Sequence, residues 1–240
     1  MSNTSFSGTV DFHTHILPQM DDGSPSAEES IRMLRASARD RVSCVLLTPH
    51  YLAERENPGR FLERRERCLD VLKQAWTAKF PLLIPGAEIA YFDGISSISA
   101  LPQMCIGQSR CLLLEMPYYT WPERMISELL ALSGRGGYHV ILAHVERYQR
   151  FQKRDVFERL IDCGVRMQTN AGFFVDWRTR RKALRLLKEG RIHLLGSDCH
   201  NMSVRPPNLG EACRILREKG MEEALHTMMA RAARLLEISR

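Results

Sequence analysis

The chain has 240 residues, 44% of them hydrophobic and 26% charged, with 34 basic and 28 acidic residues and a formal net charge of +6. This balance is ordinary for one globular domain and favours anionic partners or substrates only mildly. No apolar run approaches the roughly 18 residues of a transmembrane helix, the first ten residues do not resemble a signal peptide, and seven scattered cysteines form no CxxC pair. We therefore expect a cytoplasmic protein with reduced thiols and no segment inserted in a membrane.

Short apolar runs alternate with longer amphipathic stretches along the whole chain. Strands are predicted at residues 9–13, 44–49, 81–88, 111–116, 139–144, 166–170 and 192–198. These runs are almost continuously apolar, as expected for parallel strands buried on both faces. Helices are predicted at residues 26–41, 59–79, 122–133, 150–163, 178–189, 207–219 and 221–237. Seven such units, without a repeat or a long linker, predict a single α/β domain over residues 1–240 that is either a barrel or a doubly wound sheet.

A side chain suited to metal binding lies at or just beyond the end of nearly every predicted strand. In a βα barrel the carboxyl ends of the strands meet on one face, where active sites form. Buried polar groups without partners are costly, so such a pattern is improbable by chance. We therefore favour the barrel and expect the polar side chains to converge. The candidate metal ligands are His13, His15, Asp22, His50, Glu88, Glu115, His144, Asp198 and His200.

Five histidines and four carboxylates exceed what one metal ion accepts, so two or three ions sharing carboxylates are indicated. Mixed imidazole and carboxylate ligands suit manganese, iron or zinc. A centre of this kind is typical of phosphoester hydrolysis, because bound ions activate water and offset the charge of the transferring phosphoryl group. Arg147 and Arg205 follow two of the histidines and are the expected phosphate contacts. His200 or a bound water is the expected proton donor to the leaving group.

Seven motifs occur in one order along the chain: HTHILPQMDDGS, TPHY, PGAEI, LLLEMP, LAHVERY, QTNAG and SDCHNMSVRPP. Together they resemble the polymerase-and-histidinol-phosphatase (PHP) superfamily over residues 11 to about 208. The closer resemblance is to its bacterial protein-tyrosine phosphatases linked to capsule and exopolysaccharide synthesis. This resemblance implies a distorted (β/α)7 barrel that holds three metal ions, usually manganese.

The resemblance also implies a role for each candidate residue. One ion would be held by His13, His15, Glu88 and Asp198, a second by Glu88, Glu115 and His144, and a third by Asp22, His50 and His200. Arg147 and Arg205 match the arginines that bind the substrate phosphate. The implied substrate is phosphotyrosine on the tail of a bacterial tyrosine kinase that partners the polysaccharide export machinery. An oligomer is compatible with this reading, and neither nucleic acid nor membrane insertion is expected.

Three positions depart from the family pattern: Tyr51 replaces a second histidine, Val145 a common proline and Cys199 a small residue. Cys199 also precedes Arg205 by the spacing found in cysteine-dependent tyrosine phosphatases, but the intervening loop lacks glycine. Three further functions are compatible with the residues: a small-molecule phosphatase of the histidinol-phosphate type, a broad phosphoesterase with nuclease activity, and a metal-dependent binding module without turnover.

Several features are left with two readings. The basic stretch at residues 178–191 is either a solvated helix face or a contact for nucleic acid or another anionic surface. Four aromatic residues follow strand ends and either line the rim of the site or pack elsewhere: Tyr51, Tyr118, Tyr119 and Trp121. The remaining histidines, at positions 139, 193 and 226, are expected to be structural or exposed.

Overall fold

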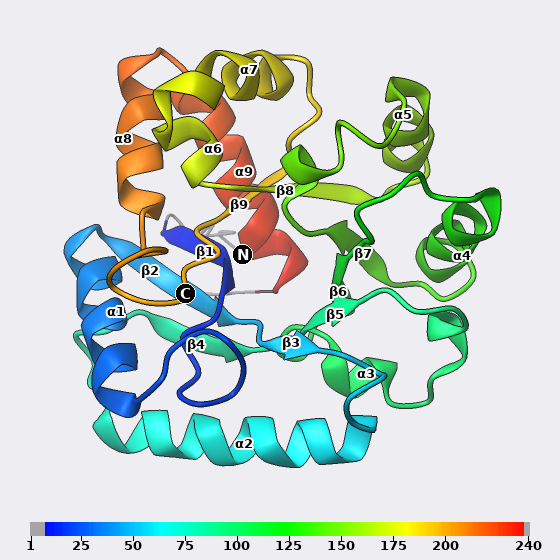
Figure 1. Cartoon of the computed structure of the whole chain (residues 1–240). Helices are drawn as coiled ribbons and strands as arrows, with labels where there is room; N and C mark the ends of the chain where they lie inside the picture. The colour runs from blue at the N-terminus through cyan, green and yellow to red at the C-terminus, as the bar shows by residue number, and fades with distance from the viewer. Residues whose placement is uncertain (1–7, 238–240) are drawn as a thin grey trace, which may run out of the picture.

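A computed structural model describes residues 8–237 and shows parallel strands in a curled arrangement with helices around them (Figure 1). Within these residues, one sheet has the order β1-β2-β4 and the other the order β3-β5-β6-β7-β8-β9. The strands are β1 (Thr9–Thr14), β2 (Val42–Leu47), β3 (His50–Tyr51), β4 (Leu82–Pro85), β5 (Glu88–Ala90), β6 (Cys111–Glu115), β7 (His139–Leu142), β8 (Arg166–Asn170) and β9 (Leu194–Gly196). The predicted α/β class with a parallel sheet is confirmed.

Backbone hydrogen bonds join the two sheets on both sides. The Glu88 N–H donates to the Pro49 carbonyl over 2.9 Å, which ties β5 to the chain beyond β2. On the other side, the His15 N–H donates to the Cys199 carbonyl over 2.9 Å, and the Asp198 N–H to the His13 carbonyl over 2.8 Å. β1 therefore lies beside β9, and the carboxyl ends of the strands face a common side.

The helices lie outside the strands, and those predicted from the sequence are present with shifted ends. They are α1 (Ala27–Arg39), α2 (Pro58–Ala75), α4 (Glu123–Ser133), α5 (Arg154–Asp162), α7 (Trp177–Lys188), α8 (Leu209–Glu218) and α9 (Glu222–Leu235). Short turns of helix that were not predicted are η1 (Ile95–Ser97), α3 (Leu101–Met104), η2 (Val145–Arg147) and α6 (Gly172–Val175). Such turns are too short to show a helical period in the sequence.

The segment predicted as one strand at residues 81–88 is two strands that belong to different sheets. β4 ends at Pro85, and β5 begins at Glu88. The change of sheet occurs at Gly86, where an added Cβ atom would lie only 2.9 Å from Ile106 Cγ1. Glycine therefore lets the backbone pass close to Ile106. As a result Glu88 begins a strand at the junction of the two sheets, rather than ending one.

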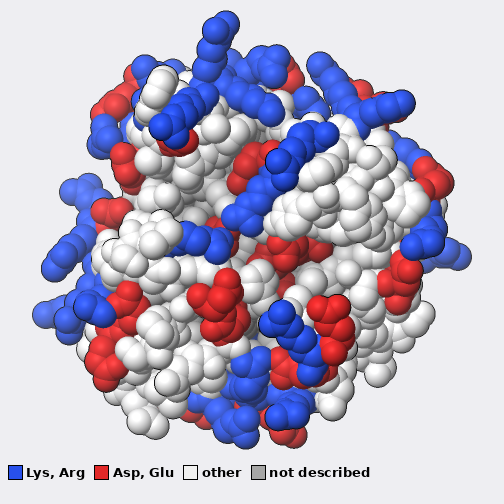
Figure 2. Space-filling model, in the orientation of Figure 1, with Lys and Arg blue, Asp and Glu red and all other residues white. Residues whose placement is uncertain are grey.

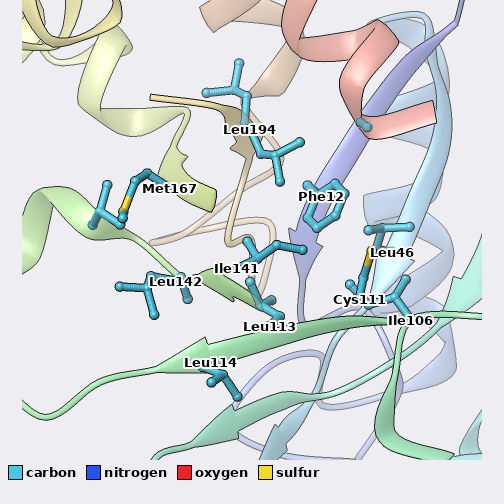
Figure 3. Packing of buried hydrophobic residues seen from close by; sticks show 14 of the residues in the cluster. Phe12, Leu46, Ile106, Cys111, Leu113, Leu114, Ile141, Leu142, Met167 and Leu194 are labelled. Atoms are coloured by element: carbon cyan, nitrogen blue, oxygen red, sulfur yellow. The ribbon is translucent and has the colours of Figure 1, made fainter. Parts of the chain in front are cut away.

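The core is formed by apolar side chains from the strands of both sheets. In Figure 3, Phe12, Leu46, Leu113, Ile141 and Leu194 extend from five strands into a shared interior, and all five are 1% exposed or less. Burial of this apolar surface is the main term that stabilises the fold. Across residues 8–237, no helix has the length and apolar character needed to cross a bilayer.

Candidate metal centre

Two histidines from the end of β1 lie on the same face, as their spacing predicts. His13 and His15 are both fully buried, and their Nε2 atoms are 3.1 Å apart. Two imidazole nitrogens at this distance can share a proton in a hydrogen bond or bind the same cation. The alternating direction of side chains along an extended segment explains the arrangement.

Glu88 is at the middle of the cluster. Its Oε2 atom is 3.1 Å from His13 Nε2, 3.3 Å from His15 Nε2 and 3.0 Å from His50 Nδ1. Its Oε1 atom is 2.9 Å from Nε2 of His144, which lies two residues after the end of β7. A single buried carboxylate thus faces four imidazoles, which is the position of a bridging ligand.

The other ligand candidates extend the cluster in three directions. Asp198 Oδ1 lies 3.4 Å from His15 Nε2, and Glu115 Oε1 lies 3.4 Å from His144 Nε2. Asp22 Oδ1 lies 3.6 Å from His50 Nε2 and 3.5 Å from His200 Nε2. All nine predicted side chains therefore come together. We name His13, His15, Glu88 and Asp198 the inner group, and Asp22, His50 and His200 the outer group.

Hydrogen bonds hold several imidazoles with one nitrogen toward the centre. His13 Nδ1 donates to Gln168 Oε1 over 3.3 Å, His15 Nδ1 to Asp21 Oδ2 over 2.7 Å, and His200 Nδ1 to the Asp198 carbonyl over 3.0 Å. Each of these bonds leaves Nε2 facing the other candidate ligands. This is the usual arrangement of metal-binding histidines, in which a second hydrogen bond fixes the ring and its tautomer.

Buried polar atoms without a hydrogen-bond partner also point to a cation. Among the described residues they include His50 Nδ1, Glu88 Oε2 and His200 Nε2, which lie near other candidate ligands without forming a hydrogen bond to them. Atoms of this kind are rare in folded proteins because an unpaired buried polar group is costly. Three sets of ligand atoms lie within 4.8 Å of one another: His15, Asp22, His50 and His200; His13, His15 and Glu88; and His50, Glu88 and Glu115. The residues present therefore fit divalent metal ions.

The charges of the cluster depend on one another. Burial by itself would lower the pKa of His15, but Asp21, Asp198 and Glu88 raise it well above its ordinary value. Burial would raise the pKa of Glu88, but the neighbouring histidines, His13 first, lower it well below its ordinary value. The carboxylates thus require positive charge beside them, which a protonated imidazole or a metal ion supplies.

Arg147 and Arg205 meet at the outer oxygen of Asp198. Arg147 Nη2 donates to Asp198 Oδ2 over 2.6 Å, and Arg205 Nη2 forms an ion pair with the same oxygen, also at 2.6 Å. Each arginine side chain is 36% exposed. Asn170 Nδ2 donates to the same oxygen over 2.7 Å. Asp198 therefore faces the histidines with one oxygen and fixes both arginines with the other. Arg147 Nη1 also donates to the Tyr118 hydroxyl over 3.3 Å, and the other N–H groups of the two arginines are left for an anion.

The backbone is strained at two of the candidate ligands. His144 has φ of 31° and Asp198 has φ of 55°, values in the left-handed region that residues other than glycine rarely adopt. His144 lies two residues after β7 and Asp198 two residues after β9, where the chain turns over the centre. Strain of this kind persists where the surrounding structure enforces it, and it is often found at functional sites.

Sequence reasoning missed the residues that orient the ligands. Asp21 fixes His15 and also accepts the His50 backbone N–H over 2.9 Å. Gln168 Oε1 accepts the His144 backbone N–H over 2.7 Å, and the Tyr148 hydroxyl lies 3.2 Å from His144 Nδ1. Gln168 had little signal, because most residues of its strand, RMQTN, are polar as well. Tyr148 had none.

Burial decides between the alternatives for the four aromatic residues and for Cys199. Tyr51 and Trp121 are 1% and 4% exposed and pack in the core, whereas Tyr118 and Tyr119 are 42% and 51% exposed. The Tyr118 hydroxyl donates to Glu115 Oε1 over 2.7 Å, so this ring belongs to the rim of the site. Cys199 is fully buried, and burial raises the pKa of its thiol well above the ordinary value, which argues against a thiolate nucleophile.

An α/β fold that gathers imidazoles and carboxylates at the carboxyl ends of parallel strands is typical of metal-dependent hydrolases. Within that class, the chain belongs to the capsular polysaccharide synthesis family CpsB/CapC, whose family model matches residues 9–237. The family resemblance predicted from the motifs is confirmed.

Individual relatives agree with this assignment. The tyrosine-protein phosphatase YwqE of Bacillus subtilis is 29% identical over 237 residues, which cover 95% of this chain and 91% of that protein. The tyrosine-protein phosphatase CpsB of Streptococcus agalactiae is 26% identical, with 95% of this chain and 98% of that protein covered. A crystal structure from work on YwqE and on CpsB of Streptococcus pneumoniae, described as unique metal-dependent tyrosine phosphatases, matches with a TM-score of 0.82 and 25% identity. It covers 95% of this chain and 94% of its own.

Proposed function

We propose that this protein is a metal-dependent protein-tyrosine phosphatase. The observation that carries the proposal is the convergence of nine ligand-type side chains beside two arginines held by one carboxylate, Asp198. The relatives named above, which are tyrosine phosphatases, support the same activity.

We propose three metal ions, manganese in the first place, with iron or zinc as substitutes. The inner group would hold one ion, Glu88 with Glu115 and His144 a second, and the outer group a third. His15 lies close enough to the outer group to take part there too. When bound, the ions would lower the pKa of water and offset the negative charge of the phosphoryl group.

Arg147 and Arg205 would bind the phosphate. Their bonds to Asp198 fix both guanidinium groups in place before the substrate arrives, so little ordering is needed on binding. The planar donors of each group match pairs of phosphate oxygens. Both arginines are partly exposed, as a substrate contact requires.

His200 is better suited to be a ligand than a proton donor. Burial, followed by the charges of His15 and Arg205, lowers the pKa of His200 to about 4. Its imidazole is therefore neutral at neutral pH, and the neutral form is the one that binds a metal. A phenolate leaving group has a pKa of about 10, so its departure does not depend strongly on a proton donor.

The substrate is proposed to be phosphotyrosine on the tail of a bacterial tyrosine kinase that controls capsular or exopolysaccharide synthesis. The exposed ring of Tyr118 at the rim offers an aromatic surface to a phosphotyrosyl side chain. A cytoplasmic location is proposed with it, supported by seven cysteines that are all unpaired.

The proposed architecture is one domain with a distorted (β/α)7 barrel. The hydrogen bonds between β1 and β9 support closure of the strands on that side. β4 continues through Gly86 directly into β5, which supports counting these two short strands as one of the seven strands of the barrel.

Hydrolysis of a phosphotyrosyl peptide with manganese, with and without EDTA, tests the proposed activity. We expect turnover that EDTA abolishes and that Cys199→Ser leaves largely unchanged. Histidinol phosphate and short oligonucleotides serve as competing substrates. A preference for either of them would make the protein a small-molecule phosphatase or a broad phosphoesterase, and absence of turnover on any aryl phosphate would favour a binding module.

A further inference from the structure

The net charge of the protein is concentrated in one short segment. Residues 178–191 contain seven basic residues and one acidic residue, which gives +6, and this equals the formal net charge of the whole chain. The other 226 residues therefore contain 27 basic and 27 acidic residues. One edge of the protein is therefore strongly cationic, and this edge is expected to turn toward a negatively charged partner.

Most of these cations lie on the outer face of α7. Arg178, Arg181, Arg185 and Lys188 are exposed at helical spacing, and Lys182 lies beside them. The opposite face packs into the fold through Ala183, Leu186 and Leu187, which are buried. In Figure 2, basic side chains project from the upper edge of the molecule, where Figure 1 places α7.

Few carboxylates neutralise this face. Among the described residues, the only ion pair of its exposed cations is a 3.9 Å contact between Arg185 Nε and Glu189 Oε1. Lys219, in the turn after α8, adds a further exposed cation next to the helix. We name the six exposed residues the basic edge: Arg178, Arg181, Lys182, Arg185, Lys188 and Lys219.

Apolar groups lie between these cations. Trp177 begins α7 and is 74% exposed, far more than Trp76 or Trp121. Trp177 and Leu184 line a hollow of about 890 Å³ together with the cations of the basic edge. An exposed indole beside lysines and arginines is characteristic of surfaces that lie in a membrane interface.

We propose that the basic edge binds the surface of an anionic phospholipid bilayer. The helix is about 18 Å long, and its buried face fixes it along the surface of the protein. Its exposed cations therefore lie in one row that can contact several phosphate groups of a bilayer surface at once. Duplex DNA would engage the same cations through its phosphates, but a phosphate backbone offers no apolar layer for the exposed indole of Trp177. An acidic polypeptide would use the cations alone and leave the indole of Trp177 without a partner.

Contact along α7 leaves the metal centre accessible. In Figure 1 the helix lies at the periphery, outside the strands whose ends carry the candidate ligands. The basic edge contains none of the residues placed in the metal centre. Binding to a bilayer is therefore expected to place the protein at a membrane surface without changing turnover of a small aryl phosphate, and it does not depend on the proposed activity.

Sedimentation of the full chain with lipid vesicles tests the proposal. The vesicles are phosphatidylcholine alone, or phosphatidylcholine with about one third phosphatidylglycerol. We expect binding only to the anionic vesicles, weakened as salt rises above about 0.1 M. The double variant Arg181→Gln/Arg185→Gln should bind about thirtyfold more weakly, at about fivefold for each cation removed. The control Arg35→Gln/Arg39→Gln removes the same charge from exposed positions of α1 and should bind like the wild type.

The fluorescence of Trp177 gives a second measure of vesicle binding, and substitution of this residue leaves the net charge of the protein unchanged. Its fluorescence should shift to the blue when anionic vesicles are added, and Trp177→Phe should remove that shift while the protein still hydrolyses aryl phosphate. Equal loss of binding in both double variants, or no binding of the wild type at low salt, would overturn the proposal. So would stronger binding to duplex DNA or to poly-glutamate than to the anionic vesicles.

Discussion

The inner and outer groups of the metal centre differ mainly in their contact with solvent. The inner side chains are at most 3% exposed, whereas two of the three outer side chains reach solvent: Asp22 is 67% exposed and His50 is 24% exposed, while His200 is buried at 2%. A buried carboxylate needs a compensating charge, while an exposed one is solvated by water. We therefore expect the inner group to be indispensable and to bind metal tightly, and the outer group to exchange its ion more readily.

The largest effect is expected from Glu88→Gln. This change removes the charge that faces four imidazoles, and several kcal/mol of stabilisation of the phosphoryl transfer should disappear with the bound ions. We expect kcat/KM for an aryl phosphate to fall by about a thousandfold or more. Steady-state kinetics together with metal analysis of the purified variant will measure both consequences.

The matched control is Glu54→Gln, at an exposed position without an ion pair among the described residues. It should retain full activity and metal content. A Glu88→Gln protein that is folded and as active as this control would mean that the inner group does not serve the reaction.

The next largest effect is expected from Arg147→Lys and from Arg205→Lys. Lysine keeps the charge but loses the planar pair of donors that fits phosphate oxygens. We expect kcat/KM to fall by about a hundredfold to a thousandfold, as for other donors to a transition state. Metal content should not change, which separates these residues from the ligands. Arg150→Lys, at an exposed neighbouring position, is the control.

Asp21 and Asp22 sharpen the comparison because they are adjacent but differ in the imidazoles that their side chains face. Asp21 has a side chain only 7% exposed and fixes His15, whereas Asp22 faces His50 and His200. Asp21→Asn should weaken manganese binding at the inner group about tenfold to a hundredfold. Asp22→Asn should remove one ion and leave the tight binding unchanged.

Isothermal titration with manganese distinguishes the two variants by affinity and stoichiometry. If Asp22→Asn weakened the tightest site as much as Asp21→Asn, the division into an inner and an outer group would be wrong.

The smallest effect concerns a histidine outside the centre, His193, which precedes β9. Burial, then the charges of Arg231 and Arg166, lowers its pKa to about 4. Between pH 6.5 and pH 4 the unfolded chain binds a proton at this residue that the folded chain does not, so stability falls as the pH falls. The loss from pH 7 to pH 5.5 should be about 1 kcal/mol.

The variant His193→Asn isolates this contribution, since an amide oxygen can replace Nδ1 as acceptor of the Met167 backbone N–H. Denaturant unfolding of both proteins at the two pH values provides the comparison. The wild type should lose about 1 kcal/mol more than the variant, and equal losses would contradict the assignment.

Much of this centre was predictable because its residues follow strand ends. The apolar runs located the strands, and the convergence of strand ends in a barrel then brought distant side chains such as His13 and Asp198 together. The junction at Gly86 did have a local signal, because Pro85 and Gly86 form a dipeptide typical of turns. The sequence does not show, however, that the chain changes sheet there. Nor does it show the burial of Tyr51, which packs edge-on against Phe61 at a ring distance of 5.2 Å. Such contacts depend on tertiary packing rather than on local pattern.

Anomalous scattering from a crystal grown with manganese is the most direct test of the central claim that these side chains share bound cations. We expect peaks at the manganese edge in contact with Glu88 and within the triangle of Asp22, His50 and His200. A well-ordered crystal with Glu88, His13 and Asp198 in place but no anomalous peak among them would contradict the account.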